Sequence, residues 1–166
     1  MGIYEELGIN FDELGCVMLD VDTPQFKKTP AIAELEEQGD MESDSHITLL
    51  FGLIGSNPTW RRYVDECLKD WEKPQEAFLA DFEIFGDGTE DVVVSTILNK
   101  SQFKQAHEML EKLPHINTYP YEPHITIGYF PKGLGELYIN ELKKAGNYRA
   151  VVKTKGINYG YTMQKG

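Results

Sequence analysis

The tripeptide His-Ile-Thr occurs twice in this chain, and these two copies are its most specific candidates for chemistry. They lie at 46–48, within SHITLL, and at 124–126, within PHITIG. Each copy is part of an aliphatic, β-branched run that predicts a strand. Because side chains alternate along a strand, the histidine and threonine of each copy should share one face, while the isoleucine points to the core.

Two imidazoles and two hydroxyls that face one another suit the cleavage of one phosphodiester. Imidazole titrates near neutrality, so one ring can take a proton from the nucleophile while the other protonates the leaving oxygen. The hydroxyls can donate hydrogen bonds to the non-bridging oxygens, where charge grows. We therefore expect His46, Thr48, His124 and Thr126 to be the catalytic residues, with no metal ion and no other cofactor.

Other residue types that could do chemistry lack a specific pattern. His107 falls on a predicted helix and His115 in a loop, so both are interpreted as structural or solvated. No spacing typical of a zinc site and no glycine-rich phosphate loop occurs in the sequence. Cys16 and Cys67 lie far apart, which favours two free thiols in a reducing compartment and predicts a cytoplasmic protein.

The elements that must position the two motifs follow one another in the same order twice. The first series is strand, helix, motif strand, helix, strand, at 16–21, 29–39, 46–53, 57–71 and 78–85. The second has the same order, at 92–98, 101–113, 124–130 and 134–145, followed by a tail, 148–162, that offers two short strands with a glycine between them. QFKK at 25–28 and QFKQ at 102–105 precede their histidines by 21 and 22 positions, which indicates a duplication.

A duplication of this kind predicts an α+β fold of one domain, residues 1–166. We expect two lobes, about 16–85 and about 92–162, related by a pseudo-twofold axis, with antiparallel sheets that face each other across a central cleft. The axis would bring the two histidine–threonine pairs opposite one another. Residues 1–14 are expected to form a short helical arm.

The composition limits the classes of ligand. With 166 residues, of which 41% are hydrophobic, the chain can bury a sizeable core. The net charge of −11 disfavours a long nucleic acid, because binding a polyanion needs many Lys or Arg contacts, but a small nucleotide in a local pocket remains possible. No long apolar run predicts a membrane span, and the acidic N-terminus does not resemble a signal peptide.

SHITLLFG and PHITIGYF resemble the paired H-x-[ST]-x signatures of the 2H phosphoesterase superfamily, and the separation of 78 positions between His46 and His124 is typical of it. The resemblance covers about residues 16 to 162. It implies a bilobal RNA ligase-like fold and assigns the four site positions to the two histidines and two threonines. The small size, the acidity and the aromatic motif ends are most similar to the phage anti-CBASS enzymes. That resemblance implies hydrolysis of 3′–5′ bonds in cyclic di- and trinucleotides, which evades a bacterial defence in the host cytoplasm.

Two other functions remain open: an RNA-end enzyme acting on 2′,3′-cyclic or 2′–5′ phosphodiesters, and a non-catalytic nucleotide-binding sponge. Base recognition needs aromatic faces. Tyrosines beside the second motif or in the tail are the candidates, with core packing as the competing interpretation: Tyr121, Tyr129, Tyr159 and Tyr161. Three tail cations could offset substrate phosphates or form a solvated strand face: Arg149, Lys153 and Lys155.

Overall fold

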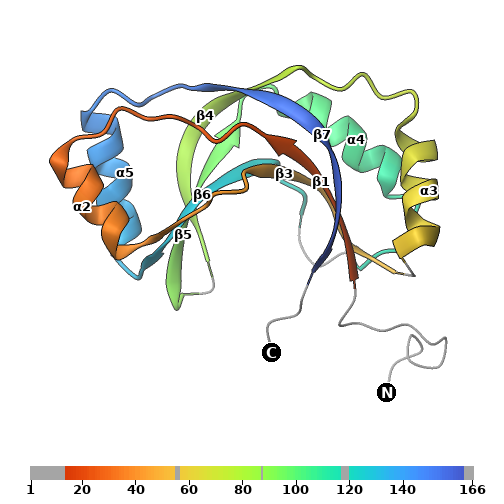
Figure 1. Cartoon of the computed structure of the whole chain (residues 1–166), viewed down its shortest axis with the longest axis horizontal. Coiled ribbons are helices and arrows are strands. Elements are labelled where there is room, and N and C mark those ends of the chain that lie inside the picture. Colours follow the sequence, from red (N-terminus) through yellow and green to blue (C-terminus); the bar gives the residue numbers. More distant parts are fainter. Residues whose placement is uncertain (1–13, 55–56, 87, 117–119, 163–166) are drawn as a thin grey trace.

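The computed structural model describes residues 14–54, 57–86, 88–116 and 120–162, without the side chains of 57–59, 161 and 162. Strands form an arch, and a pair of helices flanks it on each side (Figure 1). The first half of the chain contains β1 (Leu14–Val21), α2 (Pro30–Gln38), β2 (Asp40–Met41), β3 (His46–Leu53), α3 (Asn57–Leu68) and β4 (Glu76–Phe85). The second half contains β5 (Glu90–Ile97), α4 (Lys100–Leu110), β6 (His124–Pro131), α5 (Leu134–Lys144) and β7 (Val151–Thr162). The α+β class and the repeated element order are confirmed.

All strand pairings are antiparallel, and they connect the two halves. The strand order is β2-β6-β3-β1-β7-β4-β5. Because β5 also pairs with β6, the strands from β6 to β5 form a closed cycle of pairings. The motif strands β3 and β6 are neighbours, and each has a long partner from its own half, β1 and β5 respectively. The sheet therefore places both motifs side by side at its centre.

The contacts obey a pseudo-twofold relation between the halves. The β1–β3 pairing corresponds to β5–β6, and β1–β7 corresponds to β5–β4. Helix α2 packs on α5, and α3 packs on α4, so each helix pair takes one helix from each half (Figure 1). The packing units therefore differ from lobes cut at 16–85 and 92–162, because the helices are exchanged between the halves.

Local signals explain where the helices begin and end. The Thr29 hydroxyl accepts a hydrogen bond from Ile32 N at 3.3 Å, and Pro30 opens α2, where its missing N–H costs nothing. Gly39 ends α2 against the Phe130 ring, where a Cβ atom would lie within 2.7 Å of ring carbons. Between the helices and the sheet lies a buried apolar core that includes Ile47 and Ile125.

Three expectations about the ends of elements need correction or fall outside the structure. Helix α3 ends at Leu68 rather than 71, and the Trp71 indole N–H instead donates to the Gln102 carbonyl at 2.9 Å. The tail forms one strand, β7, without a break at Gly156, because β1 and β4 both pair with it. The arm expected at 1–14 lies outside the described residues, except for Leu14, which begins β1. Within the described ranges, no helix combines the length and apolarity needed to cross a membrane.

Candidate active site

The two motifs meet at a single matched pair of residues. Ile47 on β3 lies opposite Ile125 on β6, and both side chains are fully buried. In an antiparallel register, that pair places His46 beside Thr126 and Thr48 beside His124. All four side chains are half-buried and share the face opposite to the isoleucines. The structure thus brings the four expected catalytic residues together.

Each motif imidazole is anchored in the same way. His46 Nδ1 lies 2.9 Å from the Asp44 carbonyl, and His124 Nδ1 lies 2.8 Å from the Glu122 carbonyl. Because a carbonyl oxygen only accepts, each Nδ1 must carry the proton that is donated. Nε2 is then the position that gains or loses a proton. In both rings, Nε2 makes no hydrogen bond with any residue that the structure describes. Both rings are therefore oriented to exchange a proton through Nε2.

The two histidines differ in their surroundings. The edge of the Phe85 ring packs on His124, with ring centroids 4.9 Å apart and an interplanar angle of 69°. Burial lowers the pKa of His124, and the nearby His46 lowers it further, while the hydrogen bond to the Glu122 carbonyl opposes the shift. A lowered pKa favours the neutral form of His124, which is the form that a general base needs.

A cysteine lies near the site but is not a nucleophile. Burial raises the pKa of the Cys16 thiol to about 11, although a hydrogen bond with Thr48 partly offsets that rise. A thiol with such a pKa is protonated and unreactive near neutrality. Cys16 is therefore not a candidate nucleophile.

Tyr121 supports the first motif strand from the side. Its hydroxyl donates to the Thr48 carbonyl at 2.8 Å, and its ring stacks on His107 with centroids 3.9 Å apart and planes 3° from parallel. His107 is itself held by the Leu49 carbonyl at 2.7 Å and by Glu111 at 2.9 Å. One face of Tyr121 is thus already covered by His107, whose expected structural role agrees with these contacts.

Tyr129 and Tyr159 lie on different strands and in different surroundings. Tyr129 shares a face with Val92 and Phe85, and Phe85 packs on His124. Tyr129 lies further along β6, opposite Asp40 and Val92, where burial and neighbouring carboxylates raise its pKa. Tyr159 packs against α3 instead: its ring centroid lies 5.7 Å from that of Trp60, and its hydroxyl donates to Asp65.

The tail residues give little direct support to the site. The backbone of Tyr161 pairs with Gly15, and its side chain lies outside the described part of the chain. Lys155 forms an ion pair with Asp22 at 3.4 Å, so its charge is already offset. Arg149 and Lys153 are exposed.

Two features of the site were not expected from the sequence. Phe85 reaches His124 although 38 residues separate them, and nothing in the strand pattern indicates that contact. A cavity of about 120 Å³ also borders Thr126, and its walls include Phe26 and Met41. The sequence marks Phe26 only as part of the repeated QFKK segment.

Comparison with known proteins gives a family and a fold. Residues 25–150, which are 126 of the 166 residues, match the sequence model of the 2′-5′ RNA ligase superfamily. A structure of Kluyveromyces marxianus Usb1 with uridine monophosphate superposes with a TM-score of 0.55 at 9% identity, covering 91% of this chain and 99% of that one. The MHV ns2 PDE domain gives a TM-score of 0.48 at 9% identity, with coverage of 90% and 99%. No curated protein sequence matches significantly.

Proposed function

This chain belongs to the 2′-5′ RNA ligase superfamily, the 2H phosphoesterases, and from that premise we propose that it hydrolyses a phosphodiester of a small nucleotide without a metal ion. The observation that carries the proposal is the pair of imidazoles on β3 and β6, each anchored through Nδ1 and each presenting Nε2. Members of the superfamily act on phosphodiester bonds, and this pair supplies the acid and the base that such a reaction needs.

In the proposed reaction, His124 is the base and His46 is the acid. Neutral His124 takes a proton at Nε2 from the attacking water, whose oxygen forms the new bond to phosphorus. Protonated His46 gives its Nε2 proton to the leaving oxygen as the old P–O bond breaks. Thr48 and Thr126 donate hydrogen bonds to the non-bridging oxygens. The products are one phosphomonoester and one hydroxyl, and a return of the two protons through solvent restores the site.

The substrate that we propose is a cyclic di- or trinucleotide with 3′–5′ bonds, such as the signals of bacterial antiviral defence. Acidic residues lie around the site. Asp20 on β1 is the strand neighbour of His46 on β3, and Asp44 and Glu122 lie two residues before the histidines. Together with the net charge of −11, they oppose a long polyanion and favour a compact ligand with few phosphates. The free thiols of Cys16 and Cys67 support a reducing compartment such as the host cytoplasm.

A second candidate is an RNA-end phosphodiesterase. The fold shared with Usb1, which was solved with uridine monophosphate, favours this candidate, because a terminal nucleotide would occupy the same two-histidine face. It differs from the first candidate in the substrate rather than in the chemistry.

A substrate panel tests the proposal. The chain, in excess EDTA, is incubated with a cyclic dinucleotide, a cyclic trinucleotide, a 2′,3′-cyclic mononucleotide and a 2′–5′ dinucleotide, and the products are separated by chromatography. We expect the cyclic oligonucleotides to be opened fastest and the His46→Ala variant to leave them intact. Preference for the 2′,3′-cyclic or 2′–5′ compound would select the second candidate. Ligands that bind but return unchanged would make the chain a nucleotide sponge and overturn the enzymatic proposal.

A further inference from the structure

A small cavity beside the second motif shares only Thr126 with the four proposed catalytic residues. It has room for about 120 Å³, and Thr126 and Ser45, the residue before His46, form part of its wall. On the same measure, one water molecule needs about 10–15 Å³, so the cavity is larger than a single solvent site. It is still smaller than the roughly 300–1,000 Å³ of a pocket for a whole ligand. It therefore suits one flat ring rather than a whole nucleotide, and that ring would lie within reach of a phosphate bound at the motif face.

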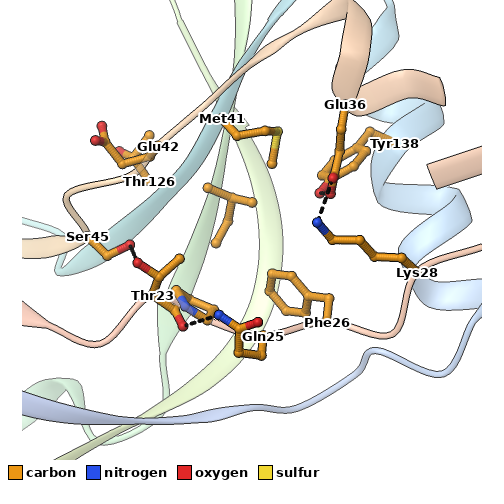
Figure 2. Close-up of a pocket in the computed structure, with 12 residues that line it drawn as sticks. Thr23, Gln25, Phe26, Lys28, Glu36, Met41, Glu42, Ser45, Thr126 and Tyr138 are labelled. Carbon is orange, nitrogen blue, oxygen red and sulfur yellow. Dashed lines mark hydrogen bonds and ion pairs between the residues drawn. The ribbon is translucent and has the colours of Figure 1, made fainter. Parts of the chain in front are cut away.

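The walls of the cavity have the chemistry of a ring-binding site. Figure 2 shows the side chains of Met41 and Phe26 on different sides of the space, with polar groups at its ends. Phe26 is fixed by an edge contact with Phe82, at a centroid distance of 5.6 Å. A thioether and an aromatic ring both contact flat π-systems favourably.

The charges that line the cavity exclude a phosphate. Lys28 Nζ is paired with Glu36 Oε1 at 2.8 Å, and Tyr138 donates to Glu36 Oε2 at 2.8 Å (Figure 2). Glu42 is then the remaining charged group of the lining, and its Oε2 accepts no hydrogen bond from a described residue. A carboxylate is acceptor-only, so the cavity favours a neutral ligand that carries N–H donors.

The repeat itself offers an internal comparison. Near the first motif, the Tyr121 hydroxyl donates to the Thr48 carbonyl, and the Tyr121 ring stacks on His107. Tyr121 lies three residues before its motif histidine, and the corresponding residue of the first motif is Ser43. The second motif thus has an aromatic ring at this offset, and the first motif has only a small hydroxyl side chain there.

We propose that the cavity bordered by Phe26, Met41 and Glu42 is a base subsite that takes an amino-bearing nucleobase of the substrate, adenine, guanine or cytosine, in preference to uracil. Adenine, guanine and cytosine each carry an exocyclic amino donor, whereas the corresponding edge of uracil presents carbonyl acceptors. Uracil would therefore place an acceptor against the Glu42 carboxylate. This inference rests on the proposed function, since it assumes that a nucleotide phosphodiester is bound at the histidines.

The test compares an all-adenine with an all-uracil cyclic dinucleotide, and the matching 2′,3′-cyclic mononucleotides if those are the substrates. For the wild type we expect a lower KM for adenine at similar kcat. Met41→Trp fills the cavity and Phe26→Ala removes one wall, so each should raise KM for the adenine substrate roughly 5- to 150-fold, the range of one lost base-stacking contact, with little change in kcat. Glu42→Gln adds an N–H donor to the cavity wall, so it should reduce the difference in KM between the adenine and the uracil substrates.

Matched controls separate this subsite from general damage. Phe78→Ala on β4 and Leu137→Trp on α5 change exposed residues away from the cavity and should keep the wild-type KM. Thermal melts identify any variant that fails to fold, and Glu42→Gln then carries the test, since it preserves the shape of the side chain. A wild type that turns over adenine and uracil substrates equally, with an unchanged KM in Met41→Trp, would overturn the base subsite but not the phosphodiesterase. Absence of turnover of every nucleotide would instead overturn the proposed function.

Discussion

Ile47 and Ile125 lie directly opposite each other on β3 and β6, and neither is exposed to solvent. This pair sits where the pseudo-twofold axis of the repeat crosses the sheet. Because the strand period is two residues, a slip of one residue in either strand would turn a motif histidine into the core. Burial of the two isoleucines therefore fixes the register on which the proposed chemistry depends.

Replacing either motif histidine should remove one proton transfer. We expect His46→Ala and His124→Ala each to lower kcat/KM by about 10²- to 10⁴-fold, and the double variant to lose far less than the product of the two losses, because the rings act as a unit. His115→Ala is the matched control, since that ring contacts the Leu113 carbonyl away from the motifs. Near-normal turnover in either motif variant would contradict the two-histidine mechanism.

The pH–rate profile should be bell-shaped. His124 must be neutral to act as the base, and burial lowers its pKa below the usual value near 6.5, so the rising limb should lie on the acid side of that value. The falling limb should follow loss of the proton from the general acid. Measurement of kcat/KM from about pH 4.5 to 9.5 should show the rising limb lost in His124→Ala. A rate that climbs throughout this range would exclude the acid–base pair.

Phe85 should help to keep the pKa of the proposed general base, His124, low. Phe85→Ala exposes the His124 ring to water, which weakens the burial that lowers its pKa. The rising limb of the profile should then move to higher pH, with a smaller effect on the rate at alkaline pH. Phe78→Ala, on the same strand but exposed, should leave the profile in place. An unmoved limb in Phe85→Ala would show that the aromatic contact does not set the pKa of the base.

Turnover should not require a divalent ion. The proposed acid, base and hydrogen-bond donors are all side chains of the chain, so we expect the same initial rate in excess EDTA as in untreated buffer. The check is an initial-rate assay before and after chelation. Activity that disappears and then returns on addition of magnesium, manganese or zinc would refute the assignment.

Asn147 should contribute strongly to stability. It is buried; its side-chain amide donates to the Lys27 and Leu142 carbonyls at 3.0 and 3.1 Å, and its oxygen accepts from Lys27 N at 2.9 Å. Asn147→Ala should therefore lower the free energy of unfolding by roughly 2–4 kcal/mol, measured by urea titration. Asn158→Ala, which loses only long, exposed contacts to Asp20, should cost about 0.5 kcal/mol or less. Equal losses in the two variants would contradict this role.

The sequence was informative where local patterns decide the structure. The two motif strands, the cap of α2 by Thr29 and the repeated element order follow from alternation, capping and spacing. The face shared by each histidine and its threonine follows from the strand period alone. These features depend on residues that are close together in the chain.

The features that the sequence did not predict depend on contacts between residues that lie far apart in the chain. Gly156 suggested a break in the tail, but pairing of β7 with both β1 and β4 keeps the strand continuous. Tyr159 suited base stacking by its type, yet the partner of its strand position is buried Val17, which turns Tyr159 toward α3. No local pattern could indicate that Phe85 packs on His124.

The exchange of helices between the halves bears on the ancestry of this protein. A single half, with α2 and α3 but without α5 and α4, would leave the inner faces of both helices uncovered. Two identical copies of such a half could cover these faces in each other, as the two halves of the chain do now. The fold thus has the form of a subunit pair whose chains were fused at the turn between β4 and β5. In a strictly symmetric pair the two histidines would have the same surroundings, whereas in a single chain the surroundings of His46 and His124 can differ, as they do here.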